Sequence, residues 1–184
     1  MRVIGGEKRG IPLLDFRQET VRPTLDRVKE SMFNIIQFFP SGQILDLFAG
    51  TGQLGIEALS RGSQQAVFCD KDAASVALIR KNLKKTGLED RAIVLQVDYK
   101  RYLKYDGAGR FDLIFLDPPY QTGLAEKALC LLGEGRLLAE ECTVVVECER
   151  QERFPEVAGV LCLGRRYDYG NVSVLIYRRK EAVG

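Results

Sequence analysis

Short apolar runs alternate with amphipathic segments from Gln43 onward, and this alternation constrains the fold more than any other feature of the sequence. Apolar runs of about four to eight residues are typical of buried strands, whereas apolar residues that recur every three or four positions are typical of helices. Strands that alternate with helices are joined by right-handed crossovers and form a parallel sheet. The expected strands are 44–48, 66–70, 92–98, 111–117 and 143–147, and the expected helices are 54–61, 73–85, a short turn around Arg101 and 124–132.

The two ends of the chain depart from this alternation. Arg22-Pro23-Thr24 is typical of a helix start with Thr24 as its cap, and apolar residues at helical spacing continue to residue 39. The charged side chains of this segment fall elsewhere on the helix, namely Arg27, Lys29 and Glu30. Near the other end, 160–167 and 172–178 are joined by a link too short for a crossover helix, so we expect an antiparallel hairpin.

These elements predict one α/β domain with a Rossmann-like fold. The 184 residues suit a single core, and the 46% apolar and 28% charged content is that of an ordinary globular protein. We expect an extended or hairpin-like segment at 1–22, a lead helix at 23–39 and a core at 43–184. The core should hold a mostly parallel seven-stranded sheet that ends in the antiparallel hairpin, with helices on both faces.

Composition excludes several kinds of chemistry. The chain has no histidine, and its five cysteines form no C-x-x-C pair, so neither a disulfide framework nor a usual zinc site is indicated, and we expect no metal. Without an imidazole, a Ser-His-Asp or Cys-His mechanism is excluded. No apolar stretch approaches the roughly 20 residues of a membrane span and no secretory signal opens the chain, so we expect a cytoplasmic protein.

A net charge of +2 is too small to indicate a nucleic-acid partner by itself, and any such contact must use a local basic cluster. Candidate clusters lie near the amino terminus, on the helix at 73–85 and near the carboxyl terminus. The last of these comprises Arg165 and Arg166 with Arg178, Arg179 and Lys180.

The tetrapeptide Asp117-Pro118-Pro119-Tyr120 follows the fourth apolar run. Two consecutive prolines cannot continue a strand or a helix, so the chain must turn there. The turn would place a carboxylate, a backbone carbonyl and an aromatic ring at the carboxyl edge of the sheet, where open α/β folds bind ligands. This combination suits a flat ring that carries an amino group, although an ordinary proline-rich turn is the simpler interpretation of these residues alone.

Four predicted strands carry an aspartate at or near their carboxyl ends, and these side chains are expected to face one crevice. They are Asp46, Asp70, Asp98 and Asp117. Any one of them could instead cap the helix that follows it. Between the first two lies a loop, Gly50-Thr51-Gly52-Gln53-Leu54-Gly55, that matches the G-x-G-x-x-G pattern of dinucleotide binding.

Charge distinguishes between the cofactors that such a crevice could hold. Two like charges about 4 Å apart repel by about 4 kcal/mol at an effective dielectric near 20, so Asp46 argues against a pyrophosphate at the glycine loop. S-adenosylmethionine instead presents an ammonium, a sulfonium and a ribose diol. Asp46 could serve its methionine end, Asp70 its ribose hydroxyls and Asp98 its adenine amino group.

Several segments together resemble the RsmD family. They are Arg22-Pro23-Thr24, the glycine loop with its continuation from Asp46 to Gly62, the Asp-Pro-Pro-Tyr turn, and Tyr167-Asp168-Tyr169-Gly170. The similarity covers essentially the whole chain. It implies a class I methyltransferase fold and S-adenosylmethionine-dependent methylation of the exocyclic N2 of a guanine in 16S rRNA, within an assembled or assembling small ribosomal subunit.

The resemblance also implies roles for individual residues. The cofactor site would comprise Asp46, Phe48, Gly50, Gly52, Gly55, Asp70, Lys71, Asp98, Tyr99 and Asp117. The catalytic turn would comprise Asp117, Pro118, Pro119 and Tyr120, with Asp117 and the Pro118 carbonyl accepting the N–H bonds of the amine and Tyr120 stacking on the base. Contacts with the target nucleotide would come from Arg22, Thr24, Arg27 and Tyr120.

Other functions remain open from the sequence. The same turn suits adenine, so an adenine-N6 methyltransferase acting on DNA or RNA is the main alternative. The G-x-G-x-x-G match alone favours a dinucleotide-binding regulatory module. An acidic Mg²⁺ site would lack the Lys/Ser phosphate loop that usually accompanies it.

Overall fold

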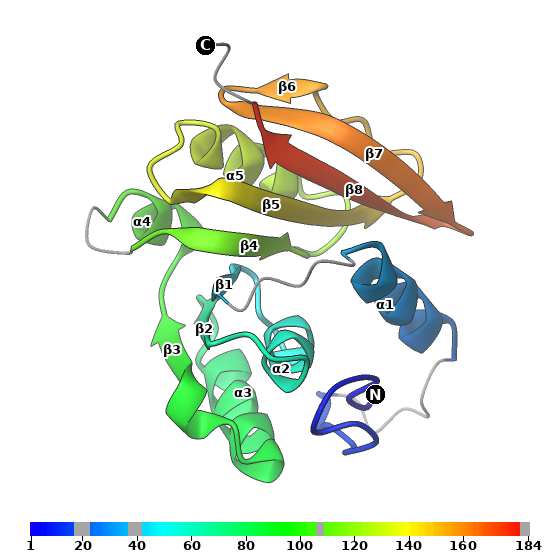
Figure 1. The fold of residues 1–184 in the computed structure, drawn as a ribbon, viewed down its shortest axis with the longest axis vertical. Helices are drawn as coiled ribbons and strands as arrows, with labels where there is room; N and C mark the ends of the chain where they lie inside the picture. Colours follow the sequence, from blue (N-terminus) through cyan, green and yellow to red (C-terminus); the bar gives the residue numbers. More distant parts are fainter. Residues whose placement is uncertain (17–22, 37–41, 106–108, 181–184) are drawn as a thin grey trace.

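The computed structural model describes residues 1–16, 23–36, 42–105 and 109–180, with 23–25 described by their backbone only, and its centre is one sheet of eight strands (Figure 1). The strand order is β3-β2-β1-β4-β5-β8-β7-β6. The first five strands in this order pair in parallel, and the last three pair antiparallel. The strands are β1 (Gln43–Asp46), β2 (Gln65–Asp70), β3 (Ala92–Gln96), β4 (Phe111–Leu116), β5 (Leu138–Glu149), β6 (Val157–Ala158), β7 (Leu161–Tyr169) and β8 (Val172–Arg179).

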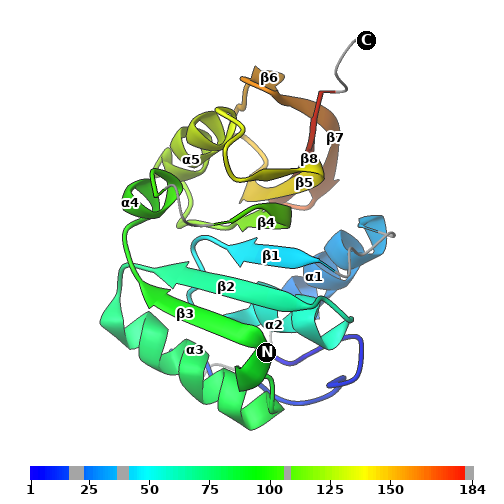
Figure 2. The ribbon, with the colours of Figure 1, turned by 60° about the vertical axis from the view of Figure 1, so that its left-hand side comes forward.

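Helices cover both faces of this sheet, as Figure 2 shows. On one face lie α4 (Tyr99–Leu103) and α5 (Leu124–Leu132), and on the other lie α1 (Pro23–Ile35), α2 (Gln53–Ser60) and α3 (Ala73–Thr86). A short 3-10 helix, η1 (Glu89–Arg91), leads into β3. Successive residues of a strand point to opposite faces, so Leu45 packs with α5 while its neighbour Ile44 packs with α1. No helix in the described part of the chain is long and apolar enough to cross a membrane.

The predicted fold class is confirmed, with one more strand than expected. The antiparallel hairpin is β7 and β8, in which Tyr169 pairs with Val172 across Gly170 and Asn171, and Gly170 takes a positive φ of 61° that this tight turn requires. The additional strand, β6, consists of two residues that pair with β7. A strand this short leaves no periodic pattern in the sequence, so only its pairing reveals it.

Several elements have bounds that differ from the prediction by a few residues, among them α1 and β5. Thr24 is the second residue of α1 rather than its cap, because the helix begins at Pro23, where a missing backbone N–H costs nothing. α1 ends at Ile35, and 37–39 of the predicted lead helix lie outside the described residues. β5 is longer than the predicted 143–147, because pairing with β8 continues to Glu149 and its first residue pairs with β4.

The N-terminal segment is fastened to α2 by the carboxylate of Glu57. The segment folds back on itself, with the Val3 N–H donating to the Ile11 carbonyl at 2.9 Å. Glu57 is completely buried and accepts hydrogen bonds from the backbone N–H groups of Ile4, at 2.8 Å, and Gly5, at 2.7 Å. Glu57, which belongs to the glycine-loop continuation from Asp46 to Gly62, therefore has a structural role.

Lys29 is buried, which contradicts the sequence interpretation that its charge lies away from the packed side of α1. Its side chain is only 4% exposed, and its Nζ donates to the Arg2 carbonyl at 2.7 Å and lies 3.7 Å from Glu57 Oε2. Burial lowers the pKa of Lys29, while the neighbouring Glu57 carboxylate raises it. Helical periodicity assigned Lys29 to a solvated face because it could not show that the N-terminal segment would cover it.

Candidate active site

An open cavity of about 560 Å³ lies where the loops after β1, β2, β3 and β4 meet. This is the carboxyl edge of the parallel sheet, the position at which open α/β folds bind ligands. The described residues that line it are Leu47, Phe48, Gly50, Gln53, Asp70, Lys71, Asp72, Ser75, Val97, Asp98, Tyr99, Asp117, Pro118, Pro119, Tyr120, Leu124 and Glu147.

The glycine loop shapes one wall of the cavity. Gly50 and Gly52 take positive φ angles of 54° and 79°, a conformation that side chains with a Cβ rarely adopt. Gly55, in the first turns of α2, packs against Phe68, where an added Cβ would lie 2.3 Å from the ring. Gly50 lines the cavity, whereas Gly52 and Gly55 set the turn and the packing of the helix behind it.

Asp70 connects the ends of β1 and β2 at the cavity wall. Its Oδ2 accepts the Gly50 N–H at 2.9 Å, and its Oδ1 accepts the Asp72 N–H at 2.9 Å. A carboxylate oxygen can accept more than one hydrogen bond, so these contacts orient Asp70 and leave acceptor capacity for hydroxyl groups.

Asp46 is the one predicted carboxylate that does not line the cavity. It is 1% exposed, and its Oδ2 accepts the Gly55 N–H at 3.0 Å beneath the glycine loop. Burial raises its pKa to about 7, with a smaller contribution from Asp70, although the Gly55 hydrogen bond lowers it. Strand ends in the sequence predict four carboxylates that face one ligand. The structure brings three of them to the cavity, because Asp46 points from β1 into the packing below the loop.

We expect Asp46→Asn to remove part of the pH dependence of stability. Asp46 has a pKa of about 7 in the folded chain, against 3.8 for an ordinary aspartate, so between pH 6 and 8 only the folded chain has to release its proton. Stability should therefore fall by about 1.4 kcal/mol over this range, or about 3 to 6 °C in Tm for a chain of this size. Asp46→Asn should show a smaller fall in thermal unfolding scans, while Asp90→Asn, an exposed control, should match the wild type. Equal slopes in the variant and the wild type would contradict the buried titration.

Asp98 and its neighbours form the wall after β3. Asp98 is exposed and caps α4, since its Oδ1 accepts the Lys100 N–H at 2.9 Å, and this is the capping role that the sequence left open. Phe48 and Tyr99 pack as a tilted aromatic pair with ring centroids 5.2 Å apart. The buried Tyr99 hydroxyl has no hydrogen-bond partner among the described residues. Lys71 is exposed at the rim.

The Asp-Pro-Pro-Tyr turn closes the remaining side, after β4. Tyr120 is 38% exposed, and its hydroxyl donates to Glu147 Oε1 at 2.8 Å. Thr122 Oγ1 donates to the Pro119 carbonyl at 2.7 Å, and Gln121 has a positive φ of 59°, an uncommon conformation for a residue other than glycine. The turn is thus fixed in a strained shape that presents the Tyr120 ring at the mouth of the cavity.

Glu147 is a site residue that the sequence interpretation missed. It lies near the end of β5, next to β4, and it approaches Asp117 closely enough to affect its ionisation. The sequence contains a signal for this role, because Glu147 lies at the carboxyl end of the predicted strand 143–147, just as the aspartates lie at the ends of their strands. Its contact with Tyr120, however, joins residues far apart in the sequence.

Burial and neighbouring carboxyls raise the pKa of Asp117 at the cavity wall. Burial raises the pKa of Asp117 well above its usual value, and the nearby carboxyls of Glu147 and Asp46 raise it further. Burial also raises the pKa of Glu147, against the hydrogen bond from Tyr120, which lowers it. Carboxyls that disfavour one another's ionisation are relieved by a cation, so the cavity favours a positively charged ligand.

The predicted nucleotide-contact residues are only partly described. Arg27 is exposed on α1 and does not line the cavity, while Arg22 and the side chain of Thr24 lie outside the described residues. Within the part of the chain that the structure describes, no group of three or more histidine, cysteine, aspartate or glutamate side chains could hold a metal ion.

The sheet order is that of the class I methyltransferase fold, whose members use S-adenosylmethionine. The acidic cavity lies at the carboxyl edge of this sheet. Residues 1–178 match the family described as "Conserved hypothetical protein 95", and the chain belongs to this family, the RsmD family. It is 42% identical over 184 residues to the Bacillus subtilis "Putative rRNA methyltransferase YlbH", covering 98% of this chain and all of that protein. It is also 36% identical to the Escherichia coli "Ribosomal RNA small subunit methyltransferase D", covering 100% of this chain and 92% of that protein.

Solved structures share the fold. The "Putative methyltransferase yhhF" of Escherichia coli superposes with a TM-score of 0.85 at 33% identity, covering 98% of both chains. A Salinibacter ruber RNA methyltransferase in complex with S-adenosyl-L-homocysteine has a TM-score of 0.66 at 20% identity, covering 90% of this chain and 96% of that one, and shows likeness of fold alone.

Proposed function

We propose that this chain transfers a methyl group from S-adenosylmethionine to the exocyclic N2 of a guanine in 16S rRNA, within an assembled or assembling small ribosomal subunit. The observation that carries the proposal is the pairing of an acidic cofactor cavity with the Asp-Pro-Pro-Tyr turn at its mouth. The names of its relatives, which refer to rRNA of the small subunit, support this substrate class. Since ribosomal RNA is found in the cytoplasm, we place the protein there. We also propose that the single domain at 1–184 carries out the reaction.

The residues that line the cavity fit the cofactor. Asp70, already oriented by two backbone N–H groups, suits a ribose diol. Phe48 and Tyr99 provide aromatic surface for a purine, and the unpartnered Tyr99 hydroxyl is a polar group that a ligand could satisfy. Asp98 keeps one carboxylate oxygen beyond its capping bond, and Lys71 stands at the rim. Asp46 acts indirectly, by holding the glycine loop in place.

The chemistry at the turn follows from the groups that it presents. S-adenosylmethionine supplies, when bound, a methyl group on a positively charged sulfur. An aryl amine is a weak nucleophile because its lone pair is delocalised into the ring. Asp117 and the Pro118 carbonyl accept the two N–H bonds of the amine and favour a pyramidal nitrogen, which localises the lone pair. As the amine takes the methyl group, the sulfur would be left as a neutral thioether, and the Asp117 carboxylate stabilises the positive charge on the nitrogen until one of its protons is released to solvent.

Tyr120 and Glu147 position the base. The Tyr120 ring stacks on the target base, a contact worth about 1 to 3 kcal/mol in nucleic-acid sites. Its hydroxyl is held by Glu147, so the ring is oriented before the substrate arrives. Reaching the amine requires the base to be unpaired or to leave its stack. Contacts from Arg22, Thr24 and Arg27 at the start of α1 complete the proposed nucleotide site.

Transfer of labelled methyl groups tests the function directly. We expect tritium from labelled S-adenosylmethionine to enter hypomethylated small subunits, and mass analysis of the nucleosides to find N2-methylguanosine. N6-methyladenosine as the product would replace the proposal with its main alternative. A thermal shift produced by NAD and not by S-adenosylhomocysteine would instead favour the dinucleotide-binding module, since a ligand at 100 times its Kd adds about 2.7 kcal/mol of stability.

A further inference from the structure

A second cavity, of about 360 Å³, lies between the end of α1 and the C-terminal hairpin. We call it the hairpin groove. The described residues that line it are Ile35, Ile36, Thr143, Gly164, Arg165, Tyr167, Ile176 and Arg178. It opens on the face of the sheet that carries α1 and is separate from the cofactor cavity, with which it shares no lining residue.

The charge of the hairpin groove is opposite to that of the cofactor cavity. Two arginines line it, Arg165 and Arg178, with no aspartate or glutamate among the described lining residues. Both are exposed, and neither forms an ion pair with a carboxylate within the described part of the chain. The cofactor cavity, by contrast, is lined by five carboxyl groups, those of Asp70, Asp72, Asp98, Asp117 and Glu147. One site therefore suits a cation and the other an anion.

The basic cluster found in the sequence is divided between the two faces of the hairpin. Arg166 donates hydrogen bonds from Nε to Asp168 Oδ1, at 3.1 Å, and from Nη2 to Ser173 Oγ, at 2.9 Å. Arg165, next to it, lies at an irregularity of β7, where the register against β8 shifts between Leu163 and Arg165. Bulges of this kind redirect side chains, and here the bulge presents Arg165 to the groove.

An aromatic ring lies beside these arginines. Tyr167 is half-buried, its ring packs against the apolar cluster under α1, and its hydroxyl accepts a hydrogen bond from Arg165 at 3.5 Å. Guanidinium groups with an adjacent aromatic ring are the combination that holds single-stranded nucleic acid, through phosphate contacts and base stacking.

The sheet register connects this groove to the catalytic turn. Glu147 pairs with Val174, and Val174 pairs with Tyr167. Directly paired residues point to the same face, and adjacent strands lie about 4.8 Å apart, so the backbones of Glu147 and Tyr167 are about 10 Å apart on one surface. A nucleic-acid strand whose target base lies over Tyr120 can reach the groove with neighbouring nucleotides.

We propose that the hairpin groove binds the RNA strand adjacent to the target nucleotide, with Arg165 and Arg178 on phosphates and Tyr167 stacked on a base. This inference rests on the proposed function and assigns part of its substrate site. It also explains why a chain of net charge +2 can bind a polyanion while keeping an acidic cofactor cavity.

The test is RNA affinity as a function of salt. In filter binding with naked 16S rRNA, the double variant Arg165→Glu/Arg178→Glu should bind at least about tenfold more weakly at 0.1 M salt. Its slope of log affinity against log salt should decrease by about 1.4, which is about 0.7 for each lost single-strand phosphate contact. Tyr167→Leu, which keeps an apolar side chain on the core, should weaken binding by about tenfold with little change in slope. In methyl transfer these variants should raise KM for RNA and leave kcat at saturating RNA nearly unchanged.

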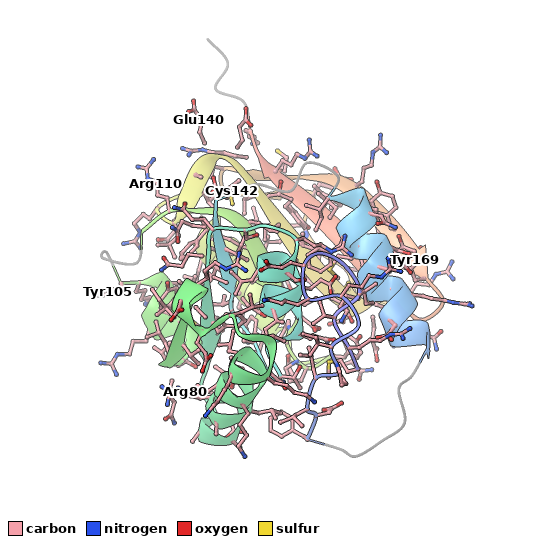
Figure 3. The ribbon with its side chains drawn as sticks, turned by 60° about the horizontal axis from the view of Figure 1, so that its bottom comes forward. Arg80, Tyr105, Arg110, Glu140, Cys142 and Tyr169 are labelled. Carbon is pink, nitrogen blue, oxygen red and sulfur yellow. The ribbon has the colours of Figure 1, made fainter. Side chains whose placement is uncertain are left out.

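The control is a charge reversal elsewhere. Arg110 is exposed just before β4, well away from Tyr169 at the end of β7 (Figure 3), so Arg110→Glu should keep wild-type affinity and slope. S-adenosylhomocysteine affinity should be the same in all variants, which shows that they are folded. A wild type that methylates RNA while the double variant matches its affinity and slope would overturn the groove assignment and leave the proposed function standing. A wild type that transfers no methyl group to RNA would refute the proposed function, and the groove assignment with it.

Discussion

Asp117→Ala is expected to lower kcat for methyl transfer by about 1,000-fold while S-adenosylhomocysteine affinity changes only slightly. In the proposed mechanism this carboxylate is the charged group of the turn that meets the developing positive charge on the amine, and removing one such group typically costs about 100- to 1,000-fold in rate. Because burial raises the pKa of Asp117, the ionised form that acts here is favoured by a positively charged cofactor in the cavity. The measurement is single-turnover transfer to small subunits, combined with calorimetric binding of S-adenosylhomocysteine.

Two further variants separate charge from shape at this position. Asp117→Asn keeps the size and one acceptor oxygen, so a rate nearly as low as that of Asp117→Ala would show that the charge is what matters. Asp90→Ala removes an exposed carboxylate on η1 and should have wild-type kinetics. Unchanged turnover in Asp117→Ala would remove the catalytic role proposed for the turn.

Glu57→Ala is expected to lower the free energy of unfolding by about 3 to 5 kcal/mol. This variant leaves the Lys29 ammonium buried without its carboxylate and the N–H groups of Ile4 and Gly5 without their acceptor. Breaking a buried ion pair from one side typically costs this amount, because the remaining charge stays desolvated. In urea unfolding the midpoint should fall accordingly, and Tm should fall by about 6 to 20 °C.

The size of this effect can be traced to Lys29 with a double variant. Lys29→Met in the Glu57→Ala background removes the stranded charge, so it should recover part of the stability that Glu57→Ala loses. Glu141→Ala, which removes an exposed carboxylate from β5, should change the free energy of unfolding by less than about 0.5 kcal/mol. A loss below about 1 kcal/mol in Glu57→Ala would show that the N-terminal segment does not depend on this carboxylate.

Most of the fold could be predicted from the sequence, because its signals are local. The helix α3 begins after Asp72 and ends at Gly87, and both signals act within one turn of the helix: Asp72 accepts the Ala74 N–H, and Gly87 takes a positive φ of 65°. The exceptions are elements defined by their partners. β6 exists through its pairing with β7, and β5 continues to Glu149 through its pairing with β8.

In the candidate site, too, some residues could be predicted from local signals and others could not. Strand ends placed Asp70, Asp98 and Asp117 together because parallel strands share one carboxyl edge. The same rule could not show that Asp46 faces the glycine loop instead of the cavity, since a shift of one residue along a strand reverses the side to which its side chain points. Nor could it show that Glu147 holds Tyr120, a contact between residues 27 positions apart.

The sequence by itself determined the order of strands and helices, the forced turn at Pro118 and Pro119, and the set of chemical groups available at the edge of the sheet. These follow from backbone restrictions and periodicity, which depend on residues close together in the chain. Only the tertiary structure decided which charges are buried, as at Asp46, Glu57 and Lys29, and how the basic cluster is shared between the faces of the hairpin. Burial and pairing are set by segments distant in sequence, and the free energy of a charge depends on what surrounds it once those segments have packed.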